Sequence, residues 1–158
     1  QPMREWTFSQ RSDLYHSPDG KKLLLNVLPP QERGFGMQPC EFHLIDNLDG
    51  HTIAILPHPT VSWARFSPDS RMLATFGNRS DTIATNVGLW NADTGERVPL
   101  PKEFPAFVQT IHFTGDGTTI QTVSDDGQFQ AWDSSTRSPR GPHARVAGDP
   151  GRRPAGKG

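Results

Sequence analysis

One short pattern occurs three times along this chain. In each copy an apolar run ends in Ser or Thr, an Asp follows two residues later, and the chain then turns; the copies start at Ser17, Ser67 and Thr114. Successive copies are 50 residues (17 to 67) and 47 residues (67 to 114) apart. A fixed period of roughly 20 to 50 residues indicates a repeat architecture, in which each repeat is one supersecondary unit. We therefore expect a fold built from three similar units.

Each turn is followed by two further apolar runs, which come into register when the turns are aligned. The aligned positions are Leu23, Leu73 and Ile120 in the second runs, and Ile45, Trp90 and Trp132 in the third runs. Alternating β-branched and aromatic residues favour strands. Turn residues such as those of 92–95 then precede a short fourth run, at 51–56 and 96–100 in the first two units. The sequence thus predicts four short antiparallel strands per unit.

The composition is typical of a chain with frequent turns. The 158 residues include 15 Gly and 15 Pro, and Pro is spread too widely for long helices. No apolar run approaches the roughly 20 residues of a membrane helix, so no membrane contact is expected. The single cysteine, Cys40, cannot form an intrachain disulfide, and the first residues lack the apolar stretch of a signal peptide. We therefore expect a cytoplasmic protein.

Charge is distributed unevenly along the chain. Of the 16 basic and 17 acidic residues, six basic and one acidic residue lie in 137–158, so the rest of the chain is acidic. Because phosphate binding requires a basic footprint, nucleic acid is not an expected partner. Residues 137–158 are mostly Gly, Pro, Arg and Ala without periodicity, which predicts a disordered basic tail.

Units of four antiparallel strands with this period resemble the blades of WD-repeat β-propellers. The order of residues within the turns and third strands looks most like bacterial WD repeats. The residues that carry the resemblance are Phe66–Ser70, Leu89–Gly95, Ser124–Gly127 and Trp132–Asp133. The resemblance implies an all-β fold, a partial β-propeller of three four-stranded antiparallel blades followed by the disordered C-terminal tail. It divides the chain into a degenerate WD-like blade at 9–56 and two further WD-like blades at 57–100 and 101–136.

Blades of this family often bury a hydrogen-bonded set of His, Ser or Thr, Asp and Trp. A buried indole N–H needs an acceptor, and a buried imidazole must bond through both nitrogens. The matching positions are His58, Thr75 and Trp90 in the second unit, and Thr122, Asp126 and Trp132 in the third. No unit has all four residues, and the first has Ile45 in place of Trp. The resemblance implies that these residues are structural and not an active site.

The turn between the second and third strands varies most among the units. It is longest in the first unit, where a Pro-rich insert contains Arg33, Phe35 and Met37. These residue types are enriched at interfaces, so the insert is a candidate contact site for a protein partner. The alternative is an ordinary solvated loop, which is the general expectation for a variable loop.

No pattern in the sequence indicates catalysis. The six histidines have no metal-ligand spacing, and there is no nucleophile elbow, phosphate loop or dinucleotide fingerprint. The turn carboxylates are explained by side chain–backbone bonding within the turns. We therefore expect a protein without enzymatic activity, metal or cofactor, which acts as a protein-interaction scaffold. The alternative is a TolB-like or hydrolase-associated periplasmic propeller, whose blades share the turn at 17–20.

Three blades do not close a ring, because propellers usually have four to eight. An open set leaves two sheet faces without a neighbouring blade, and large uncovered apolar faces favour association. Residue 1 is Gln and not Met, which suggests a fragment of a larger signalling or regulatory protein. The expected cover is therefore further blades of the same chain or, alternatively, a second copy.

Overall fold

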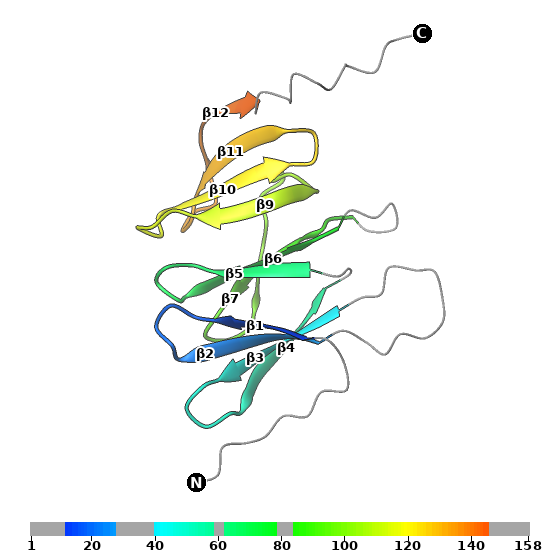
Figure 1. The fold of residues 1–158 in the computed structure, drawn as a ribbon. Coiled ribbons are helices and arrows are strands. Elements are labelled where there is room, and N and C mark those ends of the chain that lie inside the picture. Colours follow the sequence, from blue (N-terminus) through cyan, green and yellow to red (C-terminus); the bar gives the residue numbers. More distant parts are fainter. Residues whose placement is uncertain (1–11, 28–39, 59–61, 79–83, 146–158) are drawn as a thin grey trace, which may run out of the picture.

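The computed structural model describes residues 12–27, 40–58, 62–78 and 84–145, which form strands and turns without any helix (Figure 1). The first sheet contains β1 (Ser12–His16), β2 (Lys22–Val27), β3 (Cys40–Asp46) and β4 (Thr52–His58). The second contains β5 (Ser62–Phe66), β6 (Met72–Gly77), β7 (Val87–Asn91) and β8 (Arg97–Val98). The third contains β9 (Val108–Phe113), β10 (Thr119–Ser124), β11 (Gln128–Asp133) and β12 (Pro139–Arg145).

Each sheet is a meander in which consecutive strands pair antiparallel in chain order. The prediction of an all-β fold with four antiparallel strands per unit is confirmed. Alternation explains the third sheet directly: Ile120, Thr122 and Ser124 of β10 are buried, whereas the residues between them are half-buried. The described residues also contain no helix that could span a bilayer.

The three sheets are stacked face to face and bury two apolar cores between them. The core between the first and second sheets consists of Leu24, Cys40, Phe42, Leu44, Leu56, Ala64, Leu73, Trp90 and Ala92. The core between the second and third consists of Ala74, Phe76, Val87, Leu89, Phe104, Val108, Ile111, Ile120 and Trp132. Full burial of one large apolar side chain contributes roughly 1.5–3 kcal/mol, so these cores are the main source of stability.

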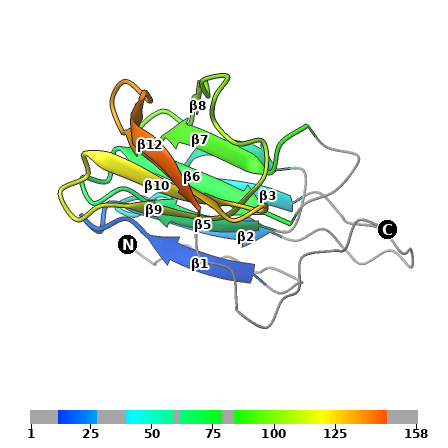
Figure 2. The same cartoon turned by 90° about the horizontal axis from the view of Figure 1, so that it is seen from above.

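The first strand of every sheet lies on the same edge of the stack. Figures 1 and 2 show β1, β5 and β9 side by side, and β5 contacts both of the others. The turns that follow these three strands all lie at one end of the sheets. The opposite end carries the turns between second and third strands. The repeat therefore places equivalent residues of the three units in rows along one edge.

Strand β12 corrects the prediction of a disordered tail at 137–158. Pro139–Arg145 pairs with β11, from Trp132 opposite Pro139 to Gln128 opposite Arg145, so the third unit extends beyond residue 136. All seven residues of β12 are exposed, and therefore no apolar alternation marks the strand in the sequence. An edge strand tolerates proline because one side of its backbone needs no partner. Residues 146–158 lie outside the described part of the chain.

The two end faces of the stack differ in chemistry. On the outer face of the first sheet, the paired row across the four strands reads Leu14, Leu25, His43 and Ile55. Leu14 and Ile55 are 53% and 52% exposed, which is high for apolar residues in strands. On the outer face of the third sheet, one row of paired residues across the four strands reads His112, Gln121, Ala131 and Arg140. The first of these rows is therefore mostly apolar and the second mostly polar, although Val123 and Phe129 form a half-buried apolar pair on the same outer face of the third sheet.

Candidate functional site

Four of the six residues expected to form structural sets are joined in two hydrogen-bonded pairs, one in the second sheet and one in the third. Trp90 Nε1 donates to Thr75 Oγ1 at 2.9 Å, and Trp132 Nε1 donates to Thr122 Oγ1 at 3.0 Å. The geometry follows from the register, because each Thr lies two residues along the neighbouring strand from the position opposite its Trp. All four side chains are buried. Each Thr thus supplies the acceptor that a buried indole N–H requires.

His58 lies near the Thr75–Trp90 pair in space. It is buried at the end of β4, where its ring meets Phe42 edge-on at 6.2 Å between centroids. It lines a hollow of about 300 Å³ together with Trp90 and Gly88. The structure therefore brings His58 and Trp90 to one cavity at the junction of the first and second sheets.

Asp126 lies in the turn next to the Thr122–Trp132 pair. It is exposed in the hairpin turn between β10 and β11, where it accepts hydrogen bonds from the Ser124 hydroxyl and from Gln128 Nε2 at 3.0 Å. The Ser124 hydroxyl is the main reason that the pKa of Asp126 lies below its usual range. Asp126 shares a hollow of about 300 Å³ with Thr122 and Trp132, and its hydrogen bonds with Ser124 and Gln128 hold the turn.

The carboxylates of the three repeated turns have the same structural role. In each turn a hydroxyl donates to the Asp two residues later: Ser17 to Asp19 at 2.6 Å, Ser67 to Asp69 at 2.5 Å, and Thr114 to Asp116 at 2.6 Å. This hydroxyl is the largest cause of the lowered pKa of each carboxyl. A general acid requires a raised pKa, so these groups suit the closing of turns and not acid catalysis.

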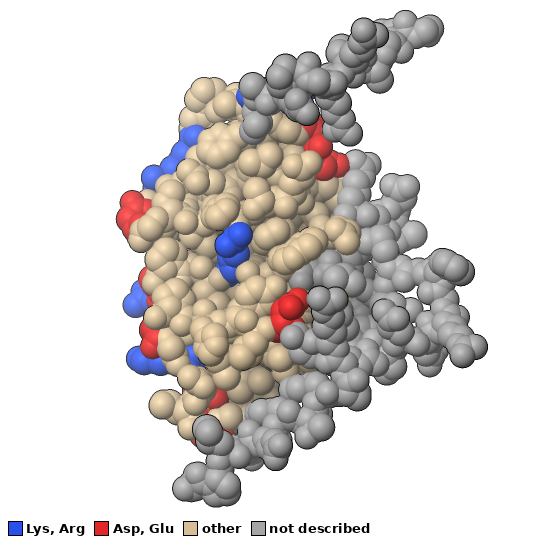
Figure 3. Space-filling model, viewed as in Figure 1, with Lys and Arg blue, Asp and Glu red and all other residues tan. Residues whose placement is uncertain are grey.

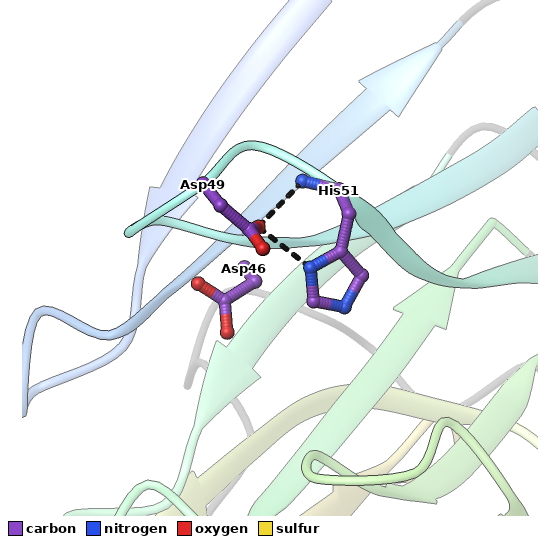
Figure 4. A group of neighbouring side chains, drawn as sticks. All are labelled: Asp46, Asp49 and His51. Atoms are coloured by element: carbon purple, nitrogen blue, oxygen red, sulfur yellow. Dashed lines mark hydrogen bonds and ion pairs between the residues drawn. The ribbon is translucent and has the colours of Figure 1, made fainter. Parts of the chain in front are cut away.

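One group of possible metal ligands lies in the turn between β3 and β4 (Figure 4). Asp49 Oδ1 accepts hydrogen bonds from the backbone N–H of His51 at 2.9 Å and pairs with its Nδ1 at 2.6 Å. Asp46 Oδ1 accepts from the N–H of Leu48 at 2.8 Å, and Asp133 makes the equivalent bond in the third sheet. Turn formation therefore accounts for the position of these side chains.

The candidate contact residues Arg33, Phe35 and Met37 lie outside the described residues, so their role stays a prediction. Sequence reasoning missed a different feature, the polar link between the first two sheets. Lys22 is largely buried, and its ammonium group binds Asp93 Oδ1 at 2.6 Å and the carbonyl oxygen of Ser70 at 3.1 Å. The available signal was a lysine at an apolar repeat position, because Met72 occupies the equivalent place in the second unit.

Comparison with known proteins supports the fold and shows no family. No family model and no curated protein matches the chain. Among solved structures 337 chains match. One of them, a eukaryotic initiation factor, has 18% sequence identity and a TM-score of 0.59, and the match covers 92% of this chain and 35% of that chain. At this identity the likeness concerns the fold alone, and this chain spans only about a third of the length of that protein.

Proposed function

We propose that the chain is a stretch of a WD-repeat-type β-propeller and that it acts as a non-catalytic protein-interaction scaffold. The observation that carries the proposal is the regular stacking of three four-stranded meanders whose first strands share one edge. Such stacking is the arrangement of successive propeller blades around an axis. The Thr–Trp pairs of the second and third sheets support the same interpretation, because they recur at equivalent positions.

The polar groups of the described residues support a binding role more than a catalytic one. The turn carboxylates are occupied by hydroxyl and backbone donors, and their pKa values lie below the usual range. A stable scaffold needs such closed turns, which leave the loops at the opposite end of the sheets to vary. We propose that a protein partner contacts those loops, in the cytoplasm, without nucleic acid or membrane.

The two end faces require a cover in the intact assembly. Leu14 and Ile55 are half exposed on the outer face of the first sheet, and a neighbouring blade would bury them. We propose further blades of a longer chain as the cover. Light scattering on the purified chain distinguishes the alternative: a mass of twice 17.5 kDa assigns the cover to a second copy.

A photo-crosslinking experiment tests the scaffold proposal. A benzophenone amino acid is placed at Asp125, in the turn between β10 and β11, and in a matched variant at Leu48, in the turn between β3 and β4 at the opposite end. Both positions are exposed. We expect a stoichiometric protein partner to be captured from Asp125 and not from Leu48. Equal capture from both positions, or turnover by the purified chain that a single substitution in a hollow abolishes, would contradict the proposal.

A further inference from the structure

An open groove of about 600 Å³ runs along the edge formed by the three first strands. Its lining consists of Leu14, Tyr15, His16, Pro18, Ala64, Arg65, Phe66, Pro68, His112 and Phe113. These residues come from the ends of β1, β5 and β9 and from the turns that follow them. The groove therefore lies at the opposite end of the sheets from Val27 and Cys40, where β2 ends and β3 begins.

The charge in this groove is concentrated on one side chain. Arg65, on the central strand β5, is the only Lys, Arg, Asp or Glu among the lining residues. Figure 3 shows the face that carries β1, β5 and β9, which is mostly tan with one blue group near its middle and one red group below it. Within the described ranges the Arg65 guanidinium makes no hydrogen bond and no ion pair, although it is exposed. Its five N–H donors are thus available for a ligand.

The walls beside Arg65 are aromatic and apolar. Phe66 and Phe113 are half-buried at equivalent positions of the second and third units, and His16 holds that position in the first. His16 and His112 add two exposed imidazoles and no negative charge. A guanidinium in a groove that aromatic side chains also line fits a carboxylate with apolar neighbours, because the fork of N–H donors matches two carboxylate oxygens.

We propose that this groove binds an extended acidic segment of a partner protein, with a Glu or Asp carboxylate on Arg65 and apolar side chains against Phe66 and Phe113. The inference rests on the proposed scaffold function and adds a second contact surface to it. Nucleic acid is the less suitable occupant, since it needs several cations along its path and the groove offers one. The chain as a whole also has a formal charge of −1.

Fluorescence anisotropy with a labelled peptide of alternating Glu and Leu tests the proposal, using the whole chain. The matched peptide has Gln at every Glu. We expect the acidic peptide to bind, the Gln peptide to bind about tenfold more weakly, and Arg65→Gln to lose about tenfold in affinity for the acidic peptide. Lys102→Gln is the control, because Lys102 is exposed and does not line the groove, and it should bind as the unaltered chain does.

Several results would overturn the proposal. They are equal affinity of the two peptides, unchanged binding by Arg65→Gln, and no binding of the acidic peptide in the millimolar range. Binding of a single-stranded oligonucleotide that depends on Arg65 would assign the groove to nucleic acid instead. Near-ultraviolet circular dichroism of each variant verifies folding, and Arg65→Lys, which keeps the charge, should bind with intermediate affinity. If the peptide fails while crosslinking from Asp125 still captures a partner, the groove proposal falls and the scaffold proposal stands.

Discussion

The backbone N–H of Asp19 donates a hydrogen bond to the hydroxyl of Ser70, at 3.0 Å, across the junction of the first and second sheets. Ser70 is buried and has a φ of 62°, in the left-handed region. The equivalent turn positions are Gly20 and Gly117, with φ values of 71° and 72°. A serine thus occupies a position that favours glycine, and its side chain supplies a bond between sheets that glycine cannot make.

Substitutions at Ser70 should separate these two effects. Ser70→Ala keeps the unfavourable φ and loses the hydrogen bond, so we expect the free energy of unfolding to fall by about 1–2 kcal/mol. Ser70→Gly loses the same bond but relieves the backbone, and its stability should lie between those of Ser70→Ala and the unaltered chain. Urea unfolding measures both. A Ser70→Ala variant as stable as the unaltered chain would show that the bond contributes nothing.

Gly88 lies where a side chain cannot be accommodated. A Cβ at this position would stand 2.6 Å from Trp90 Nε1 and 2.7 Å from Thr75 Oγ1, within the pair that these residues form. We expect Gly88→Ala to lower the free energy of unfolding by about 1–3 kcal/mol, because the Trp or the backbone must shift. The measurement is chemical denaturation, with the Trp fluorescence maximum as a readout of the displaced ring.

Gly115→Ala is the matched control for that substitution. No atom lies within 4 Å of the Cβ that it would add, and Gly115 is not among the glycines with positive φ. Its stability should stay within about 0.5 kcal/mol of the unaltered chain. Equal effects of the two alanines would mean that Gly88 is not sterically restricted.

Trp132 should be among the most sensitive positions of the second core. It is fully buried, bonded to Thr122, and packed against Phe104 at 4.8 Å between ring centroids. We expect Trp132→Ala to lower the free energy of unfolding by about 3–5 kcal/mol, because it leaves a cavity. Trp63, which is 49% exposed, is the control, and Trp63→Ala should lower the free energy of unfolding far less. A loss under about 1 kcal/mol for Trp132→Ala would contradict its place in the core.

Acid should destabilise the fold through the turn carboxylates. The pKa of Asp69 is below its ordinary value of 3.8, chiefly because the Ser67 hydroxyl donates to the carboxylate, and the same direction holds for Asp19, Asp116, Asp126 and Asp133. A carboxyl whose pKa falls on folding stabilises the protein fully above the unfolded pKa, and this contribution is lost as the pH falls through the folded pKa.

We therefore expect the free energy of unfolding to be nearly constant from neutral pH to about pH 5 and to decrease below about pH 4. Urea titrations at a series of pH values measure this dependence. The Asp69→Asn variant, which has no carboxyl to protonate there, should show a shallower decrease. A free energy of unfolding that rises on acidification would contradict the lowered pKa values of these carboxyls.

The repeat made much of the fold predictable, because its signal is local. Turns such as Ser67–Ser70 fix where strands end, and the apolar alternation around Leu73 and Ile120 fixes which faces are buried. Strand β12 escaped prediction for the opposite reason. It is held by backbone pairing to β11, and its exposed side chains carry no periodic signal.

The candidate site was less predictable, because contacts between sheets depend on stacking. The Thr75–Trp90 and Thr122–Trp132 pairs follow from residue spacing, whereas the bonds from Lys22 to Asp93 and Ser70 require the relative placement of two sheets. Arg65 lies in a groove that is lined by strands from all three units. The sequence of a single unit therefore does not predict which residues line the groove with Arg65.

The unlike end faces also limit how copies of this chain can assemble. Contact through the apolar row that includes Leu14 and Ile55 would pair that face with its own copy, since the row at the other end includes Gln121 and Arg140. A contact of a surface with itself uses that surface on both molecules and stops at two. A stack in which both end faces associated could instead grow into a fibre. Association through the row of Leu14 and Ile55 alone therefore gives a dimer that does not grow further.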